Sequence, residues 1–269
     1  MEKSSDRYVY LAAFIYALIM GHSFLFTKIA LRSAKPTDIL AYRFAAAFLG
    51  LQIPRAFGWF KVSYTFDSIK KIIPIAILYP LLFFGFQTTG LQYATSSEAG
   101  ILSAAAPIFT MILASYFLKE RTGRLQKLSI IISVIGVIYV TVMKGASLNI
   151  ANILGIVLLI LSTISLAGYS VMGRILTKDY TNVELSYMMI TISFVVYSTI
   201  AVGNHLLKGS IRNFFTPLGD ISFVISILYL GVLSSLITSL LTNYILSKIE
   251  ASRMSVFSNL GTVITIVAG

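Results

Sequence analysis

Residues 221–246, ISFVISILYLGVLSSLITSLLTNYIL, decide the fold of this chain. The stretch contains no charged side chain. It is also longer than the roughly 20 helical residues that cross a bilayer core about 30 Å thick. β-Barrels also cross membranes, but their strands alternate over about 10 residues and leave a much weaker apolar signal. The stretch therefore predicts a membrane-spanning α-helix.

Similar apolar runs follow one another along the chain, separated by charged or turn-forming residues. Together they predict nine spans, at 8–31, 37–53, 72–93, 98–118, 125–143, 152–174, 184–206, 221–246 and 252–269. Hydrophobic residues make up 57% of the chain and charged residues only 12%, about half the roughly 25% that soluble proteins carry. So few charges cannot cover a soluble surface, and we predict an all-α polytopic membrane protein.

The formal charge of +11 follows the loops between these spans. If the N-terminus lies inside, fourteen of the 21 lysines and arginines fall on the inner side, and Lys28 and Arg43 fall within spans. The five on the outer side are Arg32, Lys35, Lys144, Lys208 and Arg212. Because cytoplasmic loops are enriched in basic residues, this bias predicts a cytoplasmic N-terminus. The lipid bilayer, and not nucleic acid, is the partner that explains the charge.

The ionisable residues give no sign of an enzyme. The chain has no cysteine and two histidines, and its acidic residues all fall in tails, loops or span ends. This pattern favours neither paired acid–base catalysis, nor a metal centre, nor a proton relay within the membrane. No Gly-x4-Gly-Lys-[Ser/Thr] loop for ATP occurs. We expect no catalytic residue, no metal and no cofactor.

An internal repeat relates the two parts of the chain. Ile77-Leu78-Tyr79 recurs as Ile227-Leu228-Tyr229, and Glu98-Ala99-Gly100-Ile101-Leu102-Ser103 aligns with Arg253-Met254-Ser255-Val256-Phe257-Ser258. These matches keep their order about 150 residues apart, which gives five helices in each repeat. An odd number of crossings inverts the second copy, and inverted repeats are typical of secondary transporters.

The chain resembles the EamA branch of the drug/metabolite transporter (DMT) superfamily over its whole length. The motifs that carry the resemblance are Gly21-His22-Ser23-Phe24 with Lys28, Tyr42-Arg43-Phe44, Thr95-Ser96-Ser97-Glu98-Ala99-Gly100-Ile101-Leu102 with Pro107, Leu118-Lys119-Glu120-Arg121, and Ala251-Ser252-Arg253-Met254-Ser255-Val256-Phe257. It implies ten helices in two inverted five-helix repeats, over residues 1–148 and 149–269. In this interpretation the tenth helix is missing after Gly269, and we expect a fragment.

The resemblance implies a secondary transporter in a plasma membrane that exports a small organic metabolite, for example an amino-acid-like compound, by alternating access. Two alternatives stay open: an antiporter of phosphorylated or nucleotide-linked sugars, and a non-transporting membrane receptor or assembly subunit. The sequence does not identify the substrate, the energy coupling or the oligomeric state.

Polar and aromatic residues within the spans, whose family counterparts border the cavity, are the candidate substrate-binding set. They are His22, Tyr79, Gln87, Tyr169, Asn243 and Asn259. The alternative for each is a hydrogen bond that holds two helices together.

Three further residues are candidates for gating or structural roles. Lys28 and Arg43 either snorkel, or form ion pairs with Asp38 or Glu98, or attract a substrate carboxylate or phosphate. Pro107 removes a hydrogen bond to the Ser103 carbonyl and predicts a kink or hinge in the fourth span.

Overall fold

The structure is a computed structural model that describes residues 2–62, 64–120 and 150–268, with a few isolated positions between 121 and 149. The predicted span 125–143 lies outside these described ranges. Every other predicted span coincides with one helix or with a series of consecutive helices, and the described residues contain no strand. Six helical segments are long and apolar enough to cross a membrane within the described residues. The prediction of an all-α polytopic membrane protein is confirmed.

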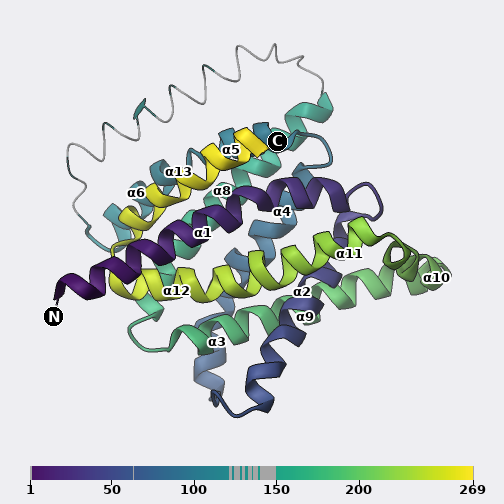
Figure 1. Ribbon diagram of the computed structural model, residues 1–269, viewed down its shortest axis with the longest axis horizontal. Helices are drawn as coiled ribbons and strands as arrows, with labels where there is room; N and C mark the ends of the chain where they lie inside the picture. The colour runs from purple at the N-terminus through teal and green to yellow at the C-terminus, as the bar shows by residue number, and fades with distance from the viewer. Residues whose placement is uncertain are drawn as a thin grey trace.

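The helices in chain order have the following bounds. They are α1 (Glu2–Ala30), α2 (Pro36–Ala56), α3 (Phe66–Ala76), η1 (Ile77–Leu82), α4 (Phe83–Gly90), α5 (Ser96–Ser103), α6 (Ala106–Phe117), α8 (Ile150–Leu176), α9 (Asn182–Leu207), α10 (Ile211–Phe215), η2 (Thr216–Gly219), α11 (Ile221–Leu228), η3 (Tyr229–Ile237), α12 (Thr238–Lys248) and α13 (Ala251–Ala268). We call the end of the bundle where α1 begins the near end, and the end where α1 finishes the far end (Figure 1).

Local sequence fixes where these helices begin. Thr95 and Thr181 each accept a hydrogen bond from a backbone N–H three residues later, and the Glu98 and Glu184 carboxylates accept one from the backbone N–H of the cap residue. This reciprocal capping box satisfies donors that a helix start leaves unpaired. Pro36 opens α2 at a position where no backbone N–H is needed.

In each half of the chain, the first span packs against spans of the other half. Helix α1 packs against α11, η3, α12 and α13, whereas α8 packs against α3, η1, α4, α5 and α6. The second spans, α2 and α9, pack against each other. Such an exchange is what an inverted pair of similar halves produces, since the first span of each half then faces the third and fourth spans of the other.

Glycines allow the closest of these approaches. A Cβ on Gly21 would lie 2.7 Å from the Ile264 side chain and 2.9 Å from the Gly261 carbonyl, so α1 and α13 touch there through their backbones. A Cβ on Gly231 would lie 2.6 Å from Ala46 Cβ and 2.7 Å from the Arg43 carbonyl. Small residues at such crossings let membrane helices pack without an apolar driving force between them.

Among the spans that the structure describes, three depart from a regular α-helix. The fourth span ends as α5 at Ser103 and resumes as α6 at Ala106, beside Pro107, as the missing backbone donor predicts. The third span, expected as one helix, is broken at Tyr79, whose backbone is extended with φ −142° and ψ 124°. The eighth span loosens into the π-helix η3. Loss of the regular i→i−4 pattern in mid-span is frequent at functional sites.

Candidate functional site

The break in the third span and the π-helical stretch in the eighth span mark the candidate site. The first is η1, which contains Ile77-Leu78-Tyr79, and the second is η3, which begins at Tyr229, the last residue of the repeated Ile227-Leu228-Tyr229. Each of these two stretches packs against a helix of the other half of the chain, η1 against α8 and η3 against α2. In inverted-repeat carriers, broken helices of this kind leave backbone and side-chain polar groups near the bilayer midplane.

Arg43 lies on α2 where that helix meets η3, and its side chain is fully buried. Its Nε donates to Ser235 Oγ at 2.7 Å, and its Nη2 donates to Ser234 Oγ at 2.9 Å and to the Ser234 carbonyl at 3.2 Å. The guanidinium carbon lies 3.6 Å from the centre of the Phe84 ring. Ser234 Oγ in turn donates to Ser23 Oγ at 2.8 Å.

Two interpretations of Arg43 are therefore wrong. It cannot snorkel, because its side chain is enclosed, and it pairs with neither Asp38 nor Glu98. Asp38, also buried, lies 3.1 Å from His205 Nε2, while His205 Nδ1 lies 3.1 Å from the Ser210 carbonyl. His205 therefore has a carboxylate partner, because the start of α2 meets the end of α9 at the far end. The pair completes no metal site, as the described residues contain no group of three potential ligands.

Below Arg43, towards the near end, aromatic and amide groups form a buried network. The rings of Tyr79 and Tyr169 stack with centroids 4.4 Å apart. The Tyr169 hydroxyl donates to Asn243 Oδ1 at 2.8 Å, and Asn243 Nδ2 donates to Ser186 Oγ at 2.9 Å. We call Arg43, Tyr79, Tyr169, Ser234, Ser235 and Asn243 the central cluster; all of them are buried and they come from α2, η1, α8, η3 and α12.

The central cluster unites half of the predicted substrate-binding set, namely Tyr79, Tyr169 and Asn243. His22 instead holds the Leu18 carbonyl of its own helix at 2.9 Å. Gln87 is buried on α4, and its Oε1 has no hydrogen-bond partner among the described residues. Asn259 lies half-buried on α13.

Sequence reasoning selected neither Ser234, which accepts hydrogen bonds from Arg43, nor Ser23, which accepts one from Ser234. Ser23, Ser234 and Ser235 are ordinary small residues in apolar spans, where hydroxyls usually bond the preceding turn of their own helix. The only signal was Arg43 itself, since a cation within a span needs polar partners from other helices.

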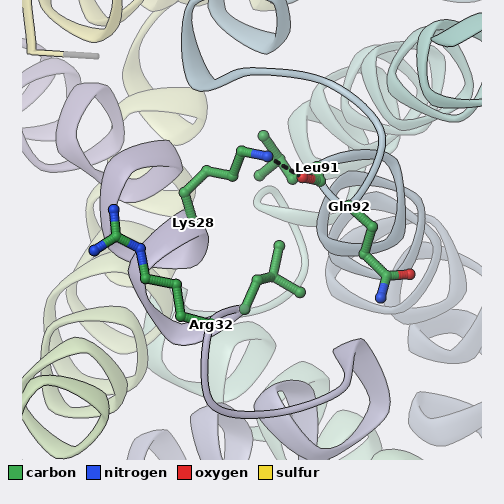
Figure 2. A pocket seen from close by; sticks show the side chains of 5 residues that line it. Lys28, Arg32, Leu91 and Gln92 are labelled. Atoms are coloured by element: carbon green, nitrogen blue, oxygen red, sulfur yellow. Dashed lines mark hydrogen bonds between the residues drawn. The ribbon is translucent and has the colours of Figure 1, made fainter.

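Lys28 lies at the far end, and it too forms no ion pair with Asp38 or Glu98. Its Nζ donates to the Leu91 carbonyl at 2.7 Å, across a pocket of about 430 Å³ lined by Lys28, Leu31, Arg32, Leu91 and Gln92. Figure 2 shows this bond bridging α1 and the loop after α4. The free backbone carbonyl at the end of α4 attracts the ammonium group more directly than a carboxylate further away.

A second far-end pocket lies on the other side of Arg32, and Asp220 forms part of it. The Ser33 hydroxyl donates to the Asp220 carboxylate at 2.5 Å, and the Ser222 backbone N–H donates to it at 2.9 Å. Both bonds favour the ionised carboxylate and lower the pKa of Asp220 below its ordinary value.

At the near end, by contrast, one carboxylate ties the two halves together. Glu120 accepts hydrogen bonds from Ser252 Oγ at 2.7 Å and from the backbone N–H groups of Ala251 and Ser252 at 3.3 Å. These donors open α13, so a negative charge is favourable there. The Tyr64 hydroxyl adds a bond to the Glu184 carbonyl at 2.8 Å.

Comparisons with known proteins agree with this architecture. The model of the EamA-like transporter family matches residues 7–142 and again 153–269. The chain is 47% identical over 269 residues to "Uncharacterized transporter YcxC" of Bacillus subtilis (strain 168), covering 100% of this chain and 86% of that protein. It is 30% identical over 250 residues to an "Uncharacterized transporter" of Archaeoglobus fulgidus, covering 93% and 84%.

A solved crystal structure shares the fold at 15% sequence identity, with a TM-score of 0.72 over 97% of this chain and 88% of the other. Family match, relatives and fold lead to one conclusion: this chain belongs to the EamA-like transporter family, a family of multi-pass membrane proteins within the drug/metabolite transporter superfamily.

Proposed function

We propose that this chain is a secondary transporter, and not an enzyme, that exports a small organic metabolite and binds it at the central cluster. One observation carries the proposal: the broken stretch η1 and the π-helical stretch η3, one from each half, both contribute side chains to the buried polar groups of the central cluster. Broken spans at the junction of two inverted halves are where carriers bind their substrates. The halves are residues 1–148 and 149–269.

Alternating access then follows from the links between the halves. At the near end, Glu120 accepts a hydrogen bond from Ser252 at the start of α13. At the far end, Ser33 donates to Asp220, and Asp38 lies within hydrogen-bond distance of His205. Each of these bonds joins one half to the other, so rocking of the halves breaks one set while keeping the other. The far-end pocket beside Lys28 is the proposed opening to the outside, with the N-terminus in the cytoplasm of a plasma-membrane protein.

The alternative substrate class, phosphorylated or nucleotide-linked sugars, is less well matched to this cluster. Its only formal charge is Arg43, whereas a phosphate ester carries about two negative charges at neutral pH. The other alternative, a non-transporting receptor, would not need hydrogen bonds between the halves at both ends of the bundle, because it would not have to open first one end and then the other.

The test is transport by purified protein in proteoliposomes loaded with a metabolite extract. Counterflow of a labelled compound, found first in an export screen of expressing and deleted cells, is the expected result. Asn243→Leu should reduce the counterflow rate at equal protein level, because it removes a central amide. The matched control is Val157→Ala at an exposed position of α8. Binding without any accumulation would instead indicate a receptor.

A further inference from the structure

The central cluster contains an incompletely paired cation. We propose that Arg43 binds the carboxylate of the transported metabolite, so that the substrate is a monoanionic carboxylic acid. This inference rests on the proposed function and specifies the substrate class of the same site.

Within the described part of the chain, one terminal nitrogen of the Arg43 guanidinium group lacks a hydrogen-bond partner. Nε and Nη2 of Arg43 bond to Ser235 and Ser234, but Nη1 is buried and has no hydrogen-bond partner among the described residues. Arginine has five N–H donors, and two of them are on Nη1. An unpaired donor that is buried destabilises a protein, so its presence in a native structure calls for an explanation, such as a role in function or a partner that binds there.

The charge of Arg43 is uncompensated as well. No carboxylate among the described residues lies within ion-pair distance of it. The groups in contact with it are the Ser234 and Ser235 hydroxyls, the Ser234 carbonyl and the Phe84 ring, and none of them carries a negative charge. Charges inside membrane proteins are normally paired or face a functional path. A bound anion would supply the missing partner and make a charge-assisted hydrogen bond, the strong kind.

The number of charges selects a carboxylate over a phosphate. One guanidinium neutralises one negative charge, and the central cluster has no lysine or second arginine. A dianionic phosphate would leave about one net negative charge enclosed, at a high desolvation cost. Phe84 covers one face of the guanidinium, so an oxyanion must approach its edge, where Nη1 lies.

The rest of the cluster suits an apolar or mixed body attached to that carboxylate. The stacked rings of Tyr79 and Tyr169 offer aromatic surface with a hydroxyl at the edge. At the far end, Lys28 and Arg32 line an open pocket and make its potential positive (Figure 2). Such a potential raises the local concentration of anions and repels cations.

The experiment measures thermal unfolding of the purified full chain with matched acids and amides. The probes are isovalerate and phenylacetate, their neutral amides, and phenylphosphonate at pH 8. We expect at least one carboxylate to raise Tm by about 5–10 °C at a concentration about 100 times its Kd. The corresponding amide and the phosphonate should shift Tm much less. Equal shifts for acid and amide, or no shift with either acid, would overturn the proposal.

Variants assign the effect to Arg43. Arg43→Gln keeps hydrogen-bond donors but removes the charge, and should abolish the carboxylate shift. Arg43→Lys keeps the charge without the planar fork, and should weaken affinity about tenfold or more. Arg212→Gln makes the same exchange at an exposed arginine and should leave the shift intact. If Arg43→Gln does not fold, the Arg43→Lys affinities and the acid–amide comparison in the unchanged protein still decide the question.

Transport separates this inference from the proposed function. If carboxylates bind through Arg43 but no compound undergoes counterflow, the transporter proposal fails and the anion site stands. If neutral metabolites are transported at a rate that Arg43→Gln does not change, the transporter proposal stands and the carboxylate site is refuted. A shift by carboxylates that survives in Arg43→Gln would show that they bind elsewhere, for example beside Lys28.

Discussion

The hydrogen bond between Tyr169 and Asn243 offers the sharpest test of the central cluster. Tyr169→Phe removes only the hydroxyl, because the phenylalanine ring can keep its stacking on Tyr79 at 4.4 Å. The change leaves Asn243 Oδ1 buried without the donor that now lies 2.8 Å away. Its Nδ2 still donates to Ser186 Oγ, so the amide cannot turn Oδ1 toward Ser186 without giving up that bond.

Two ranges of hydrogen-bond free energy, one from soluble proteins and one from membrane proteins, bound the stability that Tyr169→Phe should lose. A buried acceptor left without a partner costs about 1–3 kcal/mol in soluble proteins, whereas hydrogen bonds between membrane helices average about 0.6 and reach about 1.7 kcal/mol. The lower scale applies because an unfolded membrane protein also finds partners. Since Asn243 is fully buried, we expect the upper part of that range, about 1.5 kcal/mol, or roughly tenfold in the unfolding equilibrium.

A double-mutant cycle with Asn243→Leu isolates the bond. Each single variant orphans a polar group of the other residue, whereas the double variant replaces both partners with apolar groups. We expect the double variant to lose about 1 kcal/mol less than the sum of the two single losses. Unfolding is followed by circular dichroism during titration with sodium dodecyl sulfate, since Trp59, the single tryptophan, is exposed and reports little on the core.

The control is Tyr116→Phe, which deletes the same hydroxyl from a tyrosine that is 80% exposed and should change stability by less than about 0.5 kcal/mol. If the two single losses add within about 0.3–0.5 kcal/mol, Tyr169 and Asn243 do not interact and the described network is incorrect.

Three further predictions test the packing, the near-end link and the orientation. Gly231→Ala should destabilise the protein by about 1–3 kcal/mol in the same titration, because the added Cβ would lie 2.6 Å from Ala46 Cβ. A Cβ at Gly203 on α9 would meet nothing within 4 Å, so Gly203→Ala should be neutral or stabilising, and equal effects of the two changes would contradict the contact between η3 and α2. Glu120→Gln should lower the free energy of unfolding by about 1 kcal/mol, because it weakens the hydrogen bonds between residue 120 and the start of α13. Glu250→Gln breaks only an exposed ion pair with Arg253 and should cost less, and a larger loss for Glu250→Gln would show that Glu120 does not link the two halves. In this cysteine-free chain, Lys208→Cys should react with an impermeant thiol reagent added to intact cells and Lys178→Cys should not, and the opposite labelling would invert the proposed orientation.

The membrane class and the order of the spans could be read from the sequence alone. A run such as 221–246 crosses a bilayer because of its own length and lack of charge, and these properties depend on no other part of the chain. The repeat of Ile77-Leu78-Tyr79 at Ile227-Leu228-Tyr229 also located the break in the third span and the π-helical stretch of the eighth, although it did not reveal either irregularity. Pro107 marked a third interruption through its missing backbone donor.

The partners of the polar residues were decided only by the tertiary structure. An ion pair with Asp38 or Glu98 was one of the three alternatives for Arg43, yet its partners Ser234 and Ser235 lie about 190 residues away in sequence. The physical reason is that partner choice depends on which faces of two helices meet, and the close approach at Gly231 sets this for α2 and η3. Tyr79, Tyr169 and Asn243 were selected as polar or aromatic residues within apolar spans, but the same criterion also selected His22, whose ring bonds to its own helix. The sequence shows which polar groups lie within apolar spans and therefore need a partner, but which residue becomes that partner depends on how helices distant in sequence pack.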